Sequence, residues 1–404
     1  MPLYQYKVRN ASGNLISGVN KADSKRILIQ RLRSLNYYIV NVKEVSKYRL
    51  PFISFFKRKS ISATALALFC RQLATMLRAG LDVVSCMSTL AEQAEYPEMG
   101  RILKEITSDI EGGSSLTEAL SKYPKMFSEL FVSSVEVGEE TGNLDQILER
   151  MADYMEREAR MKAQIVSAAF YPTIIILFAV GVMVLVLVYF VPVMKDVYRQ
   201  FAEDTDLPLP TELLIKISDL FKENWLFLLV FVVLTFLAVM LFRKSDFGRY
   251  STDKLILKTP IVGQVALKIN ISRFAQTFET MMMSGMPILR AFQIMGQTIR
   301  NKVIARVMEE VRDNISRGGT IAKPLGDSEI FPPLITKMIS VGEETGDIDA
   351  MLREIARLYE QQVEHAIERM MAMIQPLLMI SIGIGVFLIA AAAYMPIFTL
   401  AKSM

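Results

Sequence analysis

Three stretches of the chain are apolar and contain no charged residue: 168–192, 225–242 and 372–396. A helix needs about 20 such residues to cross the hydrocarbon of a bilayer, and the middle stretch is the shortest of the three. The pattern predicts three transmembrane helices. It therefore indicates a mainly α-helical integral membrane protein.

Two other regions, 61–165 and 260–370, have apolar residues at the three- and four-residue spacing of amphipathic helices. In the first, Leu66, Phe69 and Leu73 share one helical face, and in the second Phe274 and Phe278 do so. Each region is predicted to be a helical bundle. We expect Gly80 and Gly285 to end the first long helix of each bundle, because glycine tolerates the left-handed conformation of a helix end.

The first 60 residues have a different pattern. Residues 1–50 alternate at the period of a strand, turn, and alternate again, then pass through a helical segment to a last alternating run, which predicts a small ββαβ domain. Residues 51–60 form a basic and aromatic linker. These 60 residues hold 13 Lys and Arg against 2 Asp and Glu. We expect them to meet anionic lipid or an acidic protein surface, since no nucleic-acid-binding motif accompanies the charge.

The chain is an internal duplication. Residues 137–145 read VGEETGNLD and residues 341–349 read VGEETGDID, 204 positions apart. Phe127, Pro172 and Pro192 also find their equivalents at this offset. Each half therefore has a helical bundle followed by an apolar span, and the span at 225–242 is an addition that the duplication does not explain.

The distribution of charge predicts the orientation in the membrane. Residues 1–165 carry 23 Lys and Arg and residues 243–372 carry 18, whereas the loop at 193–224 has 4 against 7 Asp and Glu. Basic residues are retained on the cytoplasmic side. Both bundles and the N-terminus are therefore predicted to be cytoplasmic, and the loop and the C-terminus are expected outside.

The residues needed for common catalytic sites are missing from the sequence. It contains one histidine, two cysteines in the predicted cytoplasmic part, and no phosphate-binding loop, HExxH pair or GxSxG elbow. We therefore expect no enzyme activity, no cofactor and no transition-metal site. A transporter is a weaker alternative, because the spans lack the ionisable groups that ion relays use.

The duplicated GEETG motifs are the one concentrated polar feature, and they allow two interpretations. The glycines permit a tight junction between helices, with Asn143 and Gln146 as a capping box for the second helix. Alternatively, the paired carboxylates bind a basic partner or, less plausibly, a hard cation such as Ca²⁺. The candidate residues are Gly138, Glu139, Glu140, Thr141, Gly142, Gly342, Glu343, Glu344, Thr345 and Gly346.

Taken together, these features resemble the inner-membrane platform proteins of type IV pilus assembly and type II secretion, the PilC/GspF family. The resemblance covers essentially the whole chain and rests on both GEETG motifs, on Ala79-Gly80 and Ser284-Gly285, and on Tyr171-Pro172 and Gln375-Pro376. Two positions depart from the family pattern: Ser115 replaces a glycine in the first half, and Pro324 interrupts a helix of the second.

The resemblance implies a non-enzymatic scaffold that couples a cytoplasmic hexameric ATPase to the insertion or extraction of pilin subunits. Its expected partners are that ATPase, pilin or pseudopilin helices, inner-membrane alignment proteins, lipid and further copies of the chain. We expect Pro172 and Pro376 to act as kinks where long helices enter the bilayer. Pilus assembly is the first interpretation, and a type II secretion platform acting on pseudopilins is the alternative.

Overall fold

The computed structural model describes residues 3–9, 15–21, 25–34, 37–45, 61–193 and 209–403. The chain divides into two compact units, Met1–Ser60 and Ile61–Met404. The predicted linker at 51–60 lies outside the described residues, as does the part 194–208 of the predicted loop at 193–224. The two units are considered separately.

The first unit contains three strands and one helix: β1 (Leu3–Arg9), β2 (Leu15–Lys21), α1 (Lys25–Ser34) and β3 (Tyr38–Val45). The sheet is antiparallel with the order β2-β1-β3, and a register shift between Lys7 and Val8 marks a bulge where β1 pairs with β3. Leu28 of α1 is 1% exposed and supplies the apolar contact of the helix with this unit.

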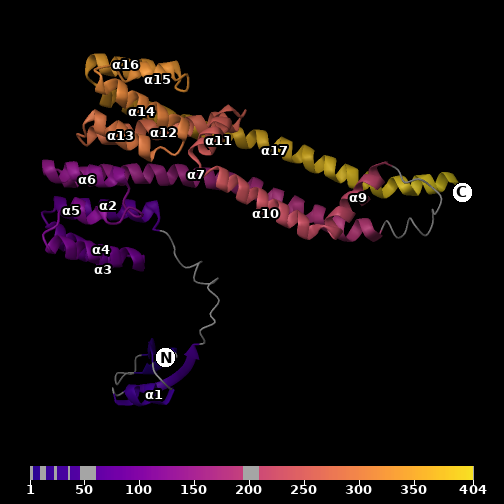
Figure 1. The fold of residues 1–404 in the computed structure, drawn as a ribbon, viewed down its shortest axis with the longest axis horizontal. Helices are drawn as coiled ribbons and strands as arrows, with labels where there is room; N and C mark the ends of the chain where they lie inside the picture. The colour runs from indigo at the N-terminus through magenta and orange to yellow at the C-terminus, as the bar shows by residue number, and fades with distance from the viewer. Residues whose placement is uncertain are drawn as a thin grey trace. The chain divides into compact units, whose positions relative to one another are not determined.

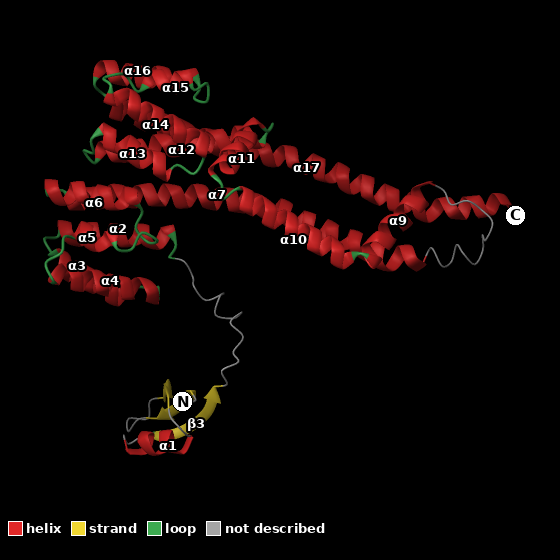
Figure 2. Cartoon of the chain, viewed as in Figure 1, coloured by secondary structure: helices red, strands yellow, loops and turns green. Residues whose placement is uncertain are grey.

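The second unit is helical and contains the same series of helices twice (Figures 1 and 2). The first repeat comprises α2 (Ala63–Arg78), α3 (Val83–Gln93), α4 (Pro97–Glu111), α5 (Leu116–Ser121), α6 (Glu129–Thr141) and α7 (Leu144–Leu185). The second comprises α12 (Val262–Met283), α13 (Ile288–Thr298), α14 (Lys302–Ser316), α15 (Ala322–Asp327), α16 (Pro333–Thr345) and α17 (Ile348–Ser403). Between them lie η2 (Val186–Phe190), α9 (Leu209–Glu223), α10 (Trp225–Phe242) and α11 (Asp246–Lys258).

Aromatic side chains occupy equivalent places in the two cores. The ring centroids of Phe69 and Phe127 lie 6.2 Å apart, and in the second repeat the rings of their equivalents Phe274 and Phe331 meet edge to face at 5.2 Å. The buried side chains of both repeats form one continuous cluster. Burial of this apolar cluster, rings included, is the main favourable contribution to folding.

The glycines at the ends of α2 and α12 adopt the left-handed conformation, with φ of +87° at Gly80 and +79° at Gly285. The amide of Leu81 donates to the carbonyl of Met76, and that of Met286 donates to the carbonyl of Met281. This is the hydrogen bonding of a Schellman motif, which satisfies carbonyls at a helix end.

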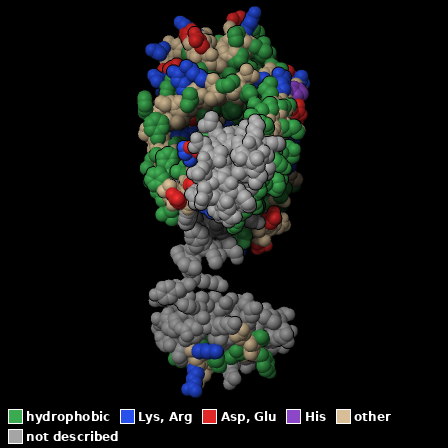
Figure 3. All heavy atoms as spheres, turned by 90° about the vertical axis from the view of Figure 1, so that its right-hand side faces the viewer, with side chains coloured by type: hydrophobic (Ala, Val, Ile, Leu, Met, Phe, Trp, Pro, Cys, Tyr) green, Lys and Arg blue, Asp and Glu red, His purple; other side chains and the backbone are tan. Residues whose placement is uncertain are grey.

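Two helices of the described part are long and apolar enough to cross a membrane, and they lie within 144–193 and 348–392. They coincide with the first and third predicted spans. The continuous apolar stretch described in α10, Leu229–Phe242, is shorter. Hydrophobic side chains cover much of the face of the second unit seen in Figure 3, and Leu177, Phe227 and Phe387 are each about 70% exposed. Such exposure is expected for side chains that face lipid.

Candidate functional site

The GEETG motifs form two equivalent junctions, one from α6 to α7 and one from α16 to α17. The last glycine of each motif reverses the chain in the left-handed conformation, with φ of +71° at Gly142 and +76° at Gly346. The first glycine allows the next helix to approach. A Cβ atom on Gly138 would lie 3.2 Å from the Cα of Leu144, and one on Gly342 would lie 3.1 Å from the Cα of Ile348.

The first glutamate of each motif binds the N-terminus of a short helix more than 20 residues earlier in the chain. The amide of Leu116 donates to Glu139 Oε1 at 2.6 Å, and the amide of Thr117 donates to Oε2 at 3.0 Å. In the second repeat, Ile321 and Ala322 donate in the same way to Glu343, at 2.5 and 3.0 Å. A carboxylate is favoured there because the first amides of a helix have no partner within it and carry partial positive charge.

The second glutamate has a different environment. Glu140 and Glu344 are both exposed, and Glu344 accepts a hydrogen bond of 3.2 Å from the Ser340 hydroxyl. The threonine that follows turns back onto its own helix, since Thr141 and Thr345 donate to the carbonyls of Val137 and Val341. The two carboxylates of each pair therefore have different roles. The first binds the start of a short helix, and the second is available for contacts at the surface.

The described residues contain no group of three or more His, Cys, Asp and Glu side chains arranged to hold a metal ion. A calcium ion usually takes six to eight oxygen ligands. In each motif, one of the two carboxylates is already engaged with backbone amides. Within the part of the chain that the structure describes, the Ca²⁺ interpretation therefore gains no supporting geometry.

The capping box predicted from Asn143 and Gln146 is wrong. Within the described structure, Asn143 precedes α7 but makes no side-chain capping hydrogen bond, and its backbone lies at φ −107°, ψ 36°. An N-cap residue normally has an extended backbone, which directs its side chain to the free amides of the helix. In the second repeat, Asp347 does accept from the amide of Ala350, at 3.3 Å.

We expect Gly138→Ala to destabilise the protein by about 1–3 kcal/mol, because the added methyl group overpacks the contact with Leu144. Gly326→Ala is the matched control, since its Cβ atom would meet only Thr336, at an ordinary 3.9 Å. Thermal unfolding of the detergent-solubilised chain measures both. Equal unfolding temperatures for the two variants would contradict the close-packing role of Gly138.

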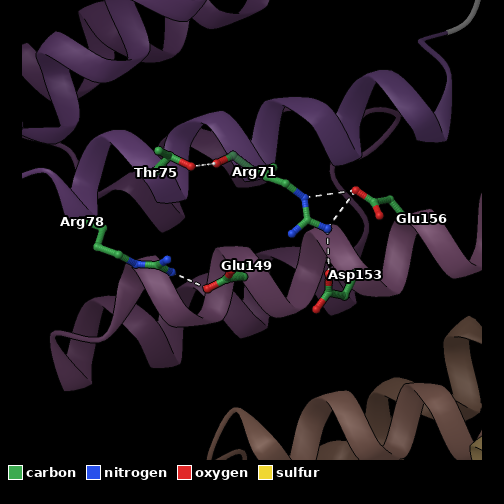
Figure 4. A network of polar contacts seen from close by, with 6 residues as sticks. All are labelled: Arg71, Thr75, Arg78, Glu149, Asp153 and Glu156. Carbon is green, nitrogen blue, oxygen red and sulfur yellow. Dashed lines mark hydrogen bonds and ion pairs between the residues drawn. The ribbon is translucent and has the colours of Figure 1, made fainter.

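Ion pairs hold α2 against α7 within the first repeat (Figure 4). Arg71 contacts Asp153 at 2.7 Å and Glu156 at 2.9 Å, and Arg78 contacts Glu149. These side chains are more than a third exposed. Each exposed ion pair of this kind contributes little to the free energy of unfolding. We therefore assign these pairs a role in aligning α2 with α7.

A buried carboxylate that the sequence analysis did not single out lies where the two repeats meet. Glu279 of α12 is 6% exposed in its side chain and lies between two arginines, 3.4 Å from Arg157 of α7 and 3.7 Å from Arg353 of α17. The equivalent position in the first repeat is Ala74. This difference between the duplicated helices is the signal that could have revealed Glu279, because a charge replaces an apolar residue on a buried helix face.

Burial raises the pKa of the Glu279 carboxyl, although Arg157 and Arg353 act in the opposite direction. Above the ordinary glutamate value, the folded chain keeps a proton that the unfolded chain has released. The contribution of Glu279 to the free energy of unfolding therefore falls as the pH rises from the pKa of the unfolded chain through that of the folded chain. We expect wild type to lose thermal stability relative to Glu279→Gln as the pH rises above the ordinary glutamate pKa. A difference that does not change with pH would contradict this.

The two prolines expected to act as kinks lie inside helices. Pro172 is within α7 and Pro376 within α17, and both helices continue past them. Near the first proline, the Thr173 hydroxyl donates to the carbonyl of Ala169 at 2.7 Å. Each helix therefore connects a GEETG junction with an apolar span as one continuous element.

Comparison with known proteins identifies the family. The model of the family "Type II secretion system (T2SS), protein F" matches residues 69–192 and 274–396, which correspond to the two repeats, and its N-terminal domain model matches residues 1–43. The type IV pilus assembly protein PilC of Thermus thermophilus is 35% identical over 404 residues, covering 98% of each chain. The type II secretion system protein F of Vibrio cholerae is 31% identical over 401 residues, also covering 98% of each chain. The chain belongs to the PilC/GspF family of type IV pilus assembly and type II secretion proteins.

Proposed function

We propose that this chain is the non-enzymatic inner-membrane platform of a type IV filament machine. In this role it couples a cytoplasmic hexameric ATPase to the insertion and extraction of pilin subunits. Family membership supports the platform role, and the absence of a phosphate-binding loop from the sequence calls for a separate motor.

One observation carries the proposal: α7 and α17 each run from a GEETG junction into an apolar span. A helix transmits rotation and displacement along its axis because every backbone group is hydrogen-bonded within it. In both repeats, the bundle is anchored to this helix at its first turn through a GEETG junction. A motor that turns or tilts the bundles would move the spans, with Pro172 and Pro376 as the points of bending.

The proposed topology has three spans, with the N-terminus and both bundles in the cytoplasm and the C-terminus outside. The excess of Lys and Arg in both bundle regions supports this orientation. In the proposed assembly, the bundles present the docking surface for the ATPase, and Glu140 and Glu344 are candidates for contact with basic residues. The uncharged spans face pilin helices and lipid, and alignment proteins of the inner membrane and further copies of the chain complete the complex.

Two filament systems fit this role. The PilC proteins of Thermus thermophilus and Myxococcus xanthus are each 35% identical to the chain, whereas the Vibrio cholerae secretion protein is 31% identical. These values favour pilus assembly, and a secretion platform that acts on pseudopilins is the second candidate.

Co-purification of the tagged chain from native membranes, followed by mass spectrometry, tests this proposal. We expect one hexameric ATPase together with pilins, or with pseudopilins if the secretion alternative holds. Recovery of neither kind of partner after mild solubilisation would overturn the proposal. Liposomes containing the purified chain alone test the transporter alternative, and we expect no flux of solute or ions.

A further inference from the structure

The two repeats are in contact through different faces. On the first repeat the contact face belongs to α6 and α7, and on the second it belongs to α12, α13 and α17. Arg290 of α13 lies 3.4 Å from the Ser133 hydroxyl and 3.9 Å from Glu136, both on α6. A Cβ atom on Gly285 would lie 4.0 Å from Val137. Arg273 of α12 and Glu158 of α7 form an ion pair at 2.9 Å.

Apart from the packing of α7 against its equivalent α17, this contact is not a twofold one. A twofold arrangement would also bring α16, the equivalent of α6, against α3, the equivalent of α13. Within the described part of one chain these two helices do not pack together, and Figure 1 shows them on opposite sides of the layer formed by α6 and α13. The contact of α6 and α7 with α12 and α13 is therefore heterologous, and each repeat keeps one matching face free.

The exposure of duplicated positions shows the same asymmetry. Leu130 of α6 is 1% exposed and lines a cavity with Arg273 of α12, whereas its equivalent on α16, Leu334, is 52% exposed. Met286, at the start of α13, is 2% exposed, and its equivalent Leu81 is 47% exposed. The packing within each repeat is duplicated. Leu130 and Met286 are therefore buried because they lie in the contact between the repeats, whereas Leu334 and Leu81 lie outside it.

We propose that the free α16 face of one chain binds the free α3 face of a second copy, in the manner of the α6–α13 contact within one chain. The faces keep the residues for such a contact: Leu334 and Val341 on α16, and Leu81 on the other side. They also complement one another in charge, since Lys337 replaces Ser133 and would face Asp82 and Ser85 at the start of α3. Buried apolar area and opposite charges both favour this pairing.

The proposed partner is a second copy of the chain. A second copy supplies an α3 face for the free α16 face, and the contact between their equivalents α6 and α13 already exists within one chain. A heterologous contact that continues from copy to copy closes into a ring when its rotation allows. This inference builds on the self-association included in the proposed function. Its experiment needs neither motor nor pilin, so the two proposals can fail independently.

Disulfide cross-linking in native membranes tests the contact. Ser85 is equivalent to Arg290 and Lys337 is equivalent to Ser133, so Ser85→Cys in one chain and Lys337→Cys in a differently tagged chain should be neighbours. The native cysteines can stay, because Cys70 and Cys86 are buried and burial raises the pKa of both thiols. We expect a disulfide between the two tagged chains when they are co-expressed, and none when either variant is expressed alone.

Two outcomes would overturn the proposal. The absence of a cross-link on co-expression would leave the α16 face to lipid or another protein, and a cross-linked dimer of either single variant would show a twofold contact instead. Leu334→Asp in the chain that carries Lys337→Cys should abolish the disulfide by burying a charge in the contact. Leu255→Asp, at a leucine of α11 that is 66% exposed, is the matched control and should leave the disulfide intact.

Discussion

A flexible insertion in α7 between Ala169 and Phe170 is expected to abolish filament assembly in a strain that depends on this chain. The site follows the contact in which Met161 packs with Val363 and Ile367 of α17, so both bundles and their mutual packing should survive. It lies at the start of the apolar span 168–192. Seven residues rich in Gly and Ser would separate the bundle from the span mechanically, because such segments behave as random coil. Electron microscopy of surface filaments measures the effect.

Seven alanines at the same place are the matched control. They add the same length, but they continue the helix by roughly two turns and return the following residues to nearly the same face. We expect this variant to retain assembly that the flexible variant loses. Normal assembly with the flexible insertion would show that α7 does not need to be continuous for its function.

The double substitution Glu139→Ala and Glu343→Ala is expected to have the second large effect. Each change removes a carboxylate that accepts from two amides at a helix start, which should cost about 1–3 kcal/mol, with the exposed Glu139 towards the lower end. The amides of Leu116, Thr117, Ile321 and Ala322 should lose protection in hydrogen–deuterium exchange of the full chain in detergent. Filament assembly should also decrease, because the helices of each bundle would lose their normal alignment.

The neighbouring pair provides the control for this prediction. Glu140→Ala together with Glu344→Ala removes the same number of charges one residue away, at exposed positions. We expect unchanged exchange in α5 and α15 and a change in stability of about 0.5 kcal/mol or less, as is usual for surface positions. Equal loss of protection in both double variants would contradict the anchoring role of Glu139 and Glu343.

Much of the helical architecture was predictable because its signals are local. The three- and four-residue spacing of Leu66, Phe69 and Leu73 indicated α2, and the VGEETG duplication indicated two equivalent bundles with a junction in each. The last motif glycine adopts a left-handed conformation that glycine reaches easily, and the first allows close approach because it has no side chain.

The partners of the polar residues were not predictable, because they come from distant parts of the chain. Glu139 lies on α6, but the amides it binds open α5, which precedes it by more than 20 residues. Glu279 lies 3.4 Å from Arg157, which α7 of the first repeat supplies from outside the bundle of α12. The capping box at Asn143 failed because the left-handed Gly142 leads into a backbone conformation that a capping residue does not use. Spacing within one element contains no information about such contacts.

Nucleotide-dependent cross-linking between the helical bundles and the proposed ATPase most directly tests the claim that a motor acts on this chain. Cysteines at the exposed Glu140 and Glu344 positions would be linked in native membranes containing the ATPase, with ATP and with a non-hydrolysable analogue. We predict cross-links to the ATPase whose yield or position changes with the nucleotide. If the bundles give no such links under conditions that support assembly, or the same links whichever nucleotide is bound, the coupling account is wrong.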